Sequence, residues 1–207
     1  MRILVLSDRV DPRIYSSFCK ERFGDVVCVI SCGDLPEHYL DFVVSILNVP
    51  LFFVHGNHDA PQEAPLAGGT NLDERVVHHR GIILAGLEGC HWYNGHVHQY
   101  TEREMRWKYF RLLPHLYWAK LKYGRYLDIL VTHAPPRGIH EGKDLPHRGF
   151  STFNFILKKY RPKYHLHGHV HLYEANQNPT EKLFDTWVVN CYGYQVIEIE
   201  PENGKGG

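Results

Sequence analysis

Six side chains that could bind a transition metal are spread along the chain, namely Asp8, Asp34, Asn57, His133, His169 and His171. Carboxylate and amide oxygens combined with imidazole nitrogens favour Mn, Fe, Zn or Mg over the metals of soft thiolate sites. A carboxylate such as Asp34 can also bridge two ions that lie about 3.5 to 4 Å apart. The residue types therefore point to a site for one or two divalent ions. Mn²⁺ is the first expectation, with Fe, Zn, Mg and Ni as alternatives.

Most of these residues follow a short apolar segment of the kind that forms a buried strand. The segments are Ile3 to Leu6 before Asp8, Val26 to Ile30 before Asp34, Leu51 to Val54 before Asn57, and Leu127 to Val131 before His133. Open α/β sheets bind their ligands at the carboxyl ends of the strands. Glycines 33, 56 and 168 precede ligand candidates, and a missing side chain lets the backbone turn sharply there. The pattern predicts a metal site at one edge of a sheet.

The segments between the strands predict the fold class. Tyr15 to Phe23 and Pro36 to Leu47 are helix candidates, so the first half alternates strand and helix. The second half has short strand candidates with no helix between the last ones: Lys163 to His167, Tyr173 to Ala175, Trp187 to Asn190 and Gln195 to Ile199. We expect an α/β protein, a four-layer α-β-β-α sandwich of two mixed sheets, with the metal site at the C-terminal edge of the strands.

The segment at about 101–125 interrupts this alternation. Thr101 and Glu104 form a possible capping box, and Pro114 is expected to break or kink the helix that follows. The segment holds seven basic and two acidic residues. One interpretation is a solvated helix whose apolar side packs on the core. The other is a helical cap or insertion over the substrate, where interleaved cations and aromatic rings would suit a nucleotide, a nucleic acid or an acyl-bearing phosphate.

Composition limits the function classes. The chain has 207 residues, 43% of them hydrophobic, which fits one domain over 1–207 with a substantial core. Its 23 basic residues balance 23 acidic ones, so overall charge does not support nucleic-acid binding. No transmembrane segment is evident, and a cytoplasmic location is expected. The five cysteines lack paired spacing and are interpreted as reduced structural thiols. The sequence leaves the oligomeric state open.

Five motifs in order resemble the calcineurin-like metallophosphoesterase family: Asp8, Gly33-Asp34, Gly56-Asn57-His58-Asp59, His133 and Gly168-His169-Val170-His171. The resemblance implies that Asp34 bridges two ions. Asn57, His133 and His169 would hold one ion, and Asp8 and His171 the other. His58 would lie near the leaving-group oxygen as a catalytic residue, and Asp59 would orient it. The implied function is hydrolysis of phosphomonoesters or phosphodiesters by in-line attack of a metal-bound hydroxide.

The first motif departs from the family pattern. The family has His two residues after the first Asp, whereas this chain has Val10. The second ion could then be held weakly, be absent, or gain another ligand. Asp11 is the nearest candidate, although Asp11-Pro12 could equally be a turn. A non-catalytic interaction scaffold on the same fold is therefore the alternative function, and a nuclease is a third possibility.

The sequence Gly-His-Val-His occurs twice, and only one copy can supply the last motif. The second copy follows an apolar segment in the expected order. The first copy lies in a predicted loop, so His96 and His98 are expected to be rim or surface residues.

Overall fold

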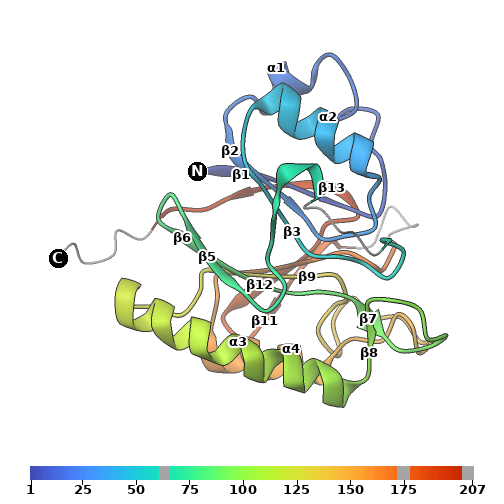
Figure 1. The fold of residues 1–207 in the computed structure, drawn as a ribbon, viewed down its shortest axis with the longest axis vertical. Helices are drawn as coiled ribbons and strands as arrows, with labels where there is room; N and C mark the ends of the chain where they lie inside the picture. The colour runs from blue at the N-terminus through green and yellow to red at the C-terminus, as the bar shows by residue number, and fades with distance from the viewer. Residues whose placement is uncertain (61–65, 172–177, 202–207) are drawn as a thin grey trace.

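Two stacked sheets form the middle of the molecule, and helices cover the outer face of each (Figure 1). The structure, a computed structural model, describes residues 1–60, 66–171 and 178–201. The first sheet has the strand order β13-β1-β2-β3-β4, in which only β13 runs antiparallel to its neighbour. Its strands are β1 (Arg2–Ser7), β2 (Val26–Ser31), β3 (Leu51–Phe53), β4 (Thr70–Asn71) and β13 (Gly193–Glu198).

The second sheet is also mixed, with the order β11-β12-β10-β9-β6-β5. Its four central strands are parallel, and the two edge strands run antiparallel to them. The strands are β5 (Val76–His79), β6 (Ile82–Leu87), β9 (Ile129–Thr132), β10 (Tyr164–His167), β11 (Thr180–Leu183) and β12 (Thr186–Asn190). A short pair, β7 (Cys90–His91) and β8 (Gln99–Tyr100), stands apart.

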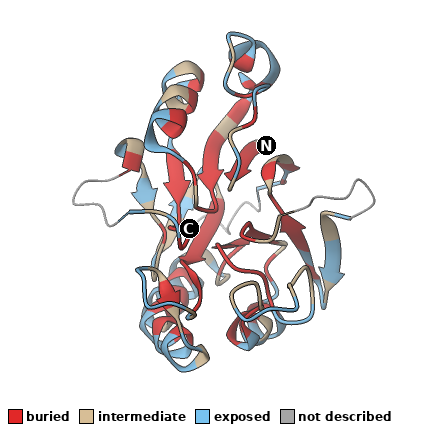
Figure 2. Cartoon of the chain, turned by 90° about the vertical axis from the view of Figure 1, so that its right-hand side faces the viewer, coloured by how far each residue is buried: buried red, intermediate tan, exposed pale blue. Residues whose placement is uncertain are grey.

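Three apolar cores separate the layers, and strand alternation produces them. In β1, Ile3 and Val5 belong to the core between the sheets, whereas Leu4 and Leu6 point to the helices outside the first sheet. Successive strand residues face opposite sides, so one strand can serve two cores. Figure 2 shows that the sheet strands are largely buried and that the outer helices bury one side only. The predicted four-layer α-β-β-α sandwich is confirmed.

The outer helices differ in length. The first sheet is covered by α1 (Cys19–Phe23) and α2 (Glu37–Leu47), and a short 3₁₀ turn, η1 (Leu66–Gly68), lies beside them. The second sheet is covered by α3 (Glu102–Tyr123) and α4 (Ser151–Tyr160). None of the helices in the described ranges is both long and apolar enough to cross a bilayer.

Two predictions about helices need correction. The first helix is shorter than predicted, because residues before Cys19 form turns. Of the predicted break or kink at Pro114, the break is wrong, since α3 continues through the proline as one helix. Leu112 and Leu116 are fully buried on either side of the proline, and this packing holds the helix together. The capping box of Thr101 and Glu104 is present. The predicted strand Tyr173 to Ala175 lies outside the described residues.

A buried ion cluster attaches α3 to the second sheet. The Nζ of Lys108 lies 2.6 Å from Asp73, 3.1 Å from Glu74 and 3.6 Å from Glu88, and the lysine is 4% exposed. Burial, together with the charge of Glu88, raises the pKa of Asp73. Lys108 therefore neutralises carboxylates that would otherwise repel one another in a poorly solvated place.

Replacing this lysine should destabilise the protein. Lys108→Met leaves the carboxylates of Asp73 and Glu88 buried without their cation, which is expected to cost about 3 to 5 kcal/mol of unfolding free energy. Urea denaturation followed by circular dichroism measures the change. Lys158→Met, at an exposed position on α4, is the matched control and should alter stability by less than about 0.5 kcal/mol. Equal stabilities of the two variants would show that the cluster does not hold α3 in place.

Candidate metal centre

Three of the candidate ligands sit where the backbone takes a left-handed turn just after a strand. The φ angles are 60° at Asp8, 58° at Asp34 and 65° at His169. Residues other than glycine rarely adopt this conformation, and it persists only where the surrounding structure enforces it. At all three positions the turn ends the strand and directs the side chain toward the same edge of the two sheets.

Glycines make room for these turns. A Cβ atom on Gly56 would lie 2.1 Å from the Asp34 carboxylate and 2.6 Å from the His133 ring. A Cβ on Gly168 would lie 2.3 Å from the Asp8 carboxylate. Real Cβ atoms do not approach other atoms so closely, so any larger residue would displace the ligands. These distances give glycines 56 and 168 a role other than the predicted sharp turn, because their missing side chains let neighbouring side chains pack close to the backbone.

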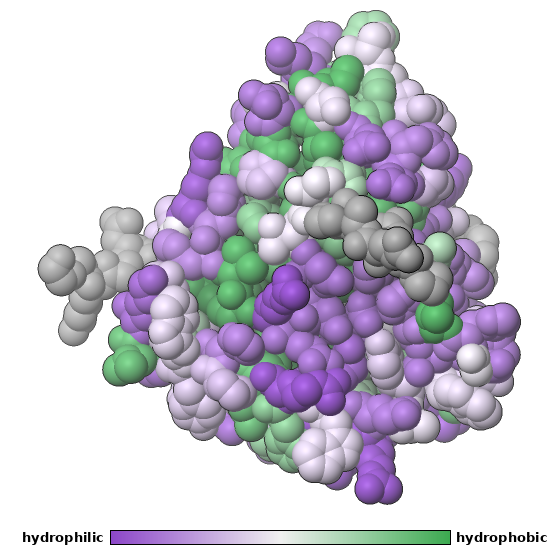
Figure 3. Space-filling view, in the orientation of Figure 1, coloured by the Kyte–Doolittle hydropathy of each residue, from purple (hydrophilic) through white to green (hydrophobic). Residues whose placement is uncertain are grey.

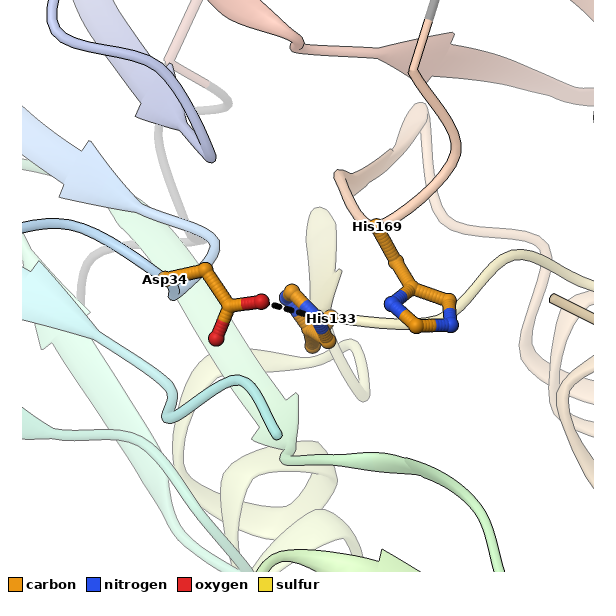
Figure 4. A group of neighbouring side chains, drawn as sticks. All are labelled: Asp34, His133 and His169. Carbon is orange, nitrogen blue, oxygen red and sulfur yellow. Dashed lines mark ion pairs between the residues drawn. The ribbon is translucent and has the colours of Figure 1, made fainter. Parts of the chain in front are cut away.

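Four donor groups converge in one place. Asp34, His133 and His169 each offer one ligand atom, and these atoms all lie within 4.8 Å of one another (Figure 4). The Nε2 of His133 lies 3.3 Å from the Asp34 carboxylate and 3.1 Å from the Asn57 side-chain oxygen. The donors come from loops after β2, β3, β9 and β10. Oxygen and imidazole donors at this spacing suit a divalent transition metal.

Hydrogen bonds at the outer ring nitrogens fix which nitrogen of each histidine faces this space. The Nδ1 of His133 lies 2.7 Å from the Cys32 carbonyl oxygen, which leaves Nε2 for a metal. The Nε2 of His169 lies 2.9 Å from the Pro146 carbonyl oxygen, which leaves Nδ1. Metal-binding histidines commonly donate their second N–H in this way, because it sets the tautomer and the ring orientation.

The protonation states of the two rings differ. Burial alone would lower the pKa of His133, but the Asp34 carboxylate beside it raises that pKa to about 9. Burial, assisted by the charge of His133, lowers the pKa of His169 to about 3. The pKa of Asp34 is lowered, because its ion pair with His133 outweighs burial. Without a metal, a proton on His133 therefore neutralises the carboxylate.

Asp8 and His171 lie next to this group of donors. Both oxygens of Asp8 accept from the backbone N–H of His169, at 3.1 and 2.9 Å, and the Nε2 of His171 lies 3.8 Å from Asp8. Burial raises the pKa of Asp8. The structure thus brings the sequence-predicted residues together in two adjacent sets, Asp34, Asn57, His133 and His169 in one, and Asp8 and His171 in the other.

Val10 stands where the family has an imidazole, and Asp11 is the nearest candidate to replace that ligand. Val10 is partly buried against the core outside the first sheet. Asp11 accepts two hydrogen bonds from the guanidinium of Arg13 and one from its backbone N–H. Its carbonyl oxygen also accepts from Ile14 and Tyr15. These bonds make Asp11 a turn residue, so the turn interpretation is favoured over the ligand interpretation.

Asp59 joins two of the ligand loops. One of its oxygens accepts from the backbone N–H groups of Asp34 and Gly56, at 3.0 and 2.8 Å. His58 donates its backbone N–H to the Asp34 carboxylate at 2.8 Å, and its side chain is exposed. An exposed imidazole beside the donors could meet a ligand arriving from solvent.

Several neighbours of the site were not identified from the sequence. The Nδ2 of Asn57 donates to the Tyr93 hydroxyl at 3.2 Å, which turns the amide oxygen toward His133. The ring of His147 stacks on His169 at 4.8 Å. Tyr93 lies near the first Gly-His-Val-His copy, but nothing in its sequence context marks it. The Cys32 and Pro146 carbonyl groups leave no sequence signal at all.

The first Gly-His-Val-His copy lies at the rim of this region. His96 is exposed, as expected. His98 is more buried than His96, since its side chain is only 15% exposed, lies 3.1 Å from Glu88 and stacks on His55 at 4.7 Å. The carboxylate of Glu88 and the ring of His55 draw His98 inward.

Metal binding should displace the proton on His133. Because that proton competes with a cation at pH values below about 9, we expect Mn²⁺ affinity to rise about tenfold per pH unit from neutrality toward pH 9. Calorimetric titration in buffers of different ionisation enthalpy measures the released proton. In His133→Asn this proton release should vanish and affinity should fall. An affinity independent of pH would contradict the arrangement.

Comparisons with known proteins agree with this fold. One solved structure shares 17% sequence identity with this chain and has a TM-score of 0.65, over 95% of this chain and 94% of that one. The protein TT1561 of Thermus thermophilus shares 18% identity with a TM-score of 0.59, over 93% of this chain and 89% of its own. These likenesses show the fold. No curated protein matches the chain.

The family assignment comes from the sequence profile. The calcineurin-like phosphoesterase profile matches residues 15–173, a span that includes Asp34, Asn57, His133, His169 and His171. The span begins after Asp8 and Val10, the segment that departs from the family pattern. The match covers well over half of the chain. The chain therefore belongs to the calcineurin-like phosphoesterase family.

Proposed function

We propose that this protein hydrolyses phosphomonoesters or phosphodiesters with one or two divalent ions. The observation that carries the proposal is the convergence of Asp34, His133 and His169 within 4.8 Å, together with the hydrogen bonds that leave Nε2 of one histidine and Nδ1 of the other available. Asn57 completes a set of two imidazoles, one carboxylate and one amide. This donor set fits a divalent transition metal, and Mn²⁺ is our first choice.

The side chains divide the remaining tasks. When bound, divalent ions supply a water of lowered pKa and neutralise phosphoryl oxygens during in-line displacement. His58, exposed beside Asp34, would give a proton to the departing alkoxide. General acid catalysis of this kind commonly contributes 10² to 10⁴ in rate. Asp59 keeps the loop of His58 against the loop of Asp34 through its two backbone hydrogen bonds.

We propose Asp8 and His171 as the ligands of a second, weaker ion. Their contact of 3.8 Å places an oxygen and a nitrogen donor side by side. Val10 offers no donor where the family has an imidazole, and Asp11 is held by Arg13. Loss of even an outer partner of a metal ligand typically costs 10- to 100-fold in affinity. Occupancy of this position should therefore require more metal than the first.

The second candidate function is a non-catalytic scaffold on the same fold. The apolar packing of Val10 against a core favours it, because a binding module has no need of two tightly held ions. The complete donor set around Asp34 and the exposed His58 favour hydrolysis, since a scaffold needs no proton donor beside a metal. A nuclease would share the metal site and differ only in the substrate.

The proposal also covers the domain organisation and the cellular location of the protein. We propose that residues 1–207 act as one domain, with α3 in its outer helix layer. The five cysteines are free and buried, which agrees with a reducing compartment and with the cytoplasmic location proposed here.

Hydrolysis of an aryl phosphomonoester and an aryl phosphodiester with added Mn²⁺ tests the function. The wild-type protein should turn over at least one ester. His58→Asn should retain its metal and lose about 10² to 10⁴ in turnover. Asp34→Asn should lose both metal and turnover. Elemental analysis of each purified variant separates these two cases.

His38→Asn is the matched control, because His38 is an exposed histidine at the start of α2. It should keep full activity. Metal binding without turnover of either ester would favour the scaffold. Full turnover in His58→Asn would remove the proposed role of that histidine. Failure to bind Mn²⁺ would contradict the choice of metal, and failure to bind Fe²⁺, Zn²⁺, Mg²⁺ and Ni²⁺ as well would contradict the whole proposal.

A further inference from the structure

The long helix α3 is apolar on two opposite sides. Its inner side carries Met105, Leu112 and Leu116, all fully buried against the second sheet and α4. Its outer side carries five large apolar residues that are 44% to 87% exposed, namely Trp107, Phe110, Tyr117, Trp118 and Leu121. Such residues usually point inward on a helix that covers a core.

Helix periodicity places the outer residues on one continuous stripe. Trp107 and Phe110 are three positions apart, Phe110 and Tyr117 are seven apart, and both Tyr117 and Trp118 lie three or four positions before Leu121. At 3.6 residues per turn these positions fall on one face of the helix. The buried residues occupy the opposite face. In Figure 3 pale and green residues lie among deep purple ones over the lower part of the molecule, where Figure 1 places α3 and α4. We call the five residues the outer stripe.

Positive charge surrounds the outer stripe. Helices α3 and α4 carry eight Lys and Arg residues against two Glu residues, in a chain whose formal net charge is zero. Seven of these cations are exposed, namely Arg103, Arg106, Arg111, Lys120, Lys122, Lys158 and Lys159. Both glutamates accept hydrogen bonds from helix N-terminal backbone groups. Arg111 is paired with Glu74, and Lys108 with the buried carboxylates. The other six cations are exposed and outnumber the two glutamates, so the helix layer is basic.

Charge and shape select the partner of the outer stripe. A two-fold dimer through α3 would bring the same cations of both copies together, which is unfavourable. Single-stranded nucleic acid stacks its bases on aromatic rings along a groove, whereas the stripe lies on the outer face of one helix. Leu121, its most exposed member at 87%, offers no ring. An anionic lipid surface accepts both the apolar side chains and the cations beside them.

An apolar recess beside the outer stripe agrees with a lipid partner. A cavity of about 330 Å³ lies between α3 and α4, lined by Tyr109, Phe110 and Phe155, with Arg106 and Glu102 among its polar residues. Phe110 belongs to both the recess and the outer stripe. The recess can admit an apolar group while Arg106 meets a phosphate.

We propose that the outer stripe of α3 docks the protein on an anionic lipid surface. Aromatic and leucine side chains enter the boundary between headgroups and acyl chains, and the flanking cations pair with lipid phosphates and carboxylates. At the N-terminus of α3, Glu102 accepts hydrogen bonds from the backbone N–H groups of Ser151 and Thr152, the first residues of α4. This end of α3 therefore adjoins the loop that leads from His133 to α4. Docking would therefore present the site edge beside the membrane. The proposal does not depend on the hydrolytic function.

Sedimentation with lipid vesicles tests this docking. The protein should bind vesicles of an equimolar mixture of phosphatidylcholine and phosphatidylserine, bind phosphatidylcholine vesicles far less, and release as salt increases. Trp118→Ser and Leu121→Ser should each lower partitioning about tenfold, because each removes a large apolar side chain from the boundary. Lys122→Glu should have an effect of similar size.

Trp187→Ser is the matched control, since Trp187 is 45% exposed on β12, away from α3. It should bind vesicles like the wild type. All four variants should hydrolyse a small soluble aryl ester as the wild type does, which separates docking from the hydrolytic function.

Three results would overturn the proposal. Vesicle binding that is absent, or that is unchanged in Trp118→Ser, would contradict docking through the outer stripe. Binding of a single-stranded oligonucleotide that is lost in Trp118→Ser, without vesicle binding, would assign the stripe to nucleic acid. A dimer in sedimentation velocity that Leu121→Ser dissociates would assign it to a second copy.

Discussion

The site depends on left-handed turns at the ends of strands. Asp8, Asp34 and His169 adopt positive φ angles directly after or close to a strand end, and this conformation costs energy in residues with a Cβ. The cost is tolerated because the turns are fixed by neighbours. Asp8 donates its backbone N–H to the Gly33 carbonyl group and accepts from His169 through its side chain. Each turn is thus held by another, and the ligands form one unit across both sheets.

The turns can support one another only because the two stacked sheets bring their loops together. Parallel strands bring their carboxyl ends to one edge, and two stacked sheets provide two such edges side by side. The loops after β1, β2 and β3 come from the first sheet, and those after β9 and β10 come from the second. The core between the sheets, with residues such as Val5, Ile30 and Val131, sets the distance across which Asp34 meets His133.

The features predicted from the sequence are those that depend on short segments of the chain. Apolar segments followed by polar residues located four of the strands with ligands, and the order of the motifs indicated the site. Contacts made by backbone atoms could not be predicted from the sequence. The hydrogen bonds to the Pro146 and Cys32 carbonyl groups depend on how distant loops pack. Helix α4 was not predicted from the sequence, and its N-cap, Phe150, is not one of the polar residues that mark a helix start. The inward position of His98 depends on Glu88, which tertiary packing brings to it.

The hydrogen bonds of Asp59 have a consequence for how variants of this protein are interpreted. One carboxylate oxygen bonds to Gly56 and to Asp34, so it fixes the separation between the loop that carries Asn57 and the loop that carries the bridging carboxylate candidate. Asp59, whose proposed task is to orient His58, is therefore also a structural connection between two loops. Loss of turnover on changing it would report site assembly and proton transfer together, and kinetic data alone would not distinguish them. Asp59 thus has an architectural role that its position beside His58 does not reveal in the sequence.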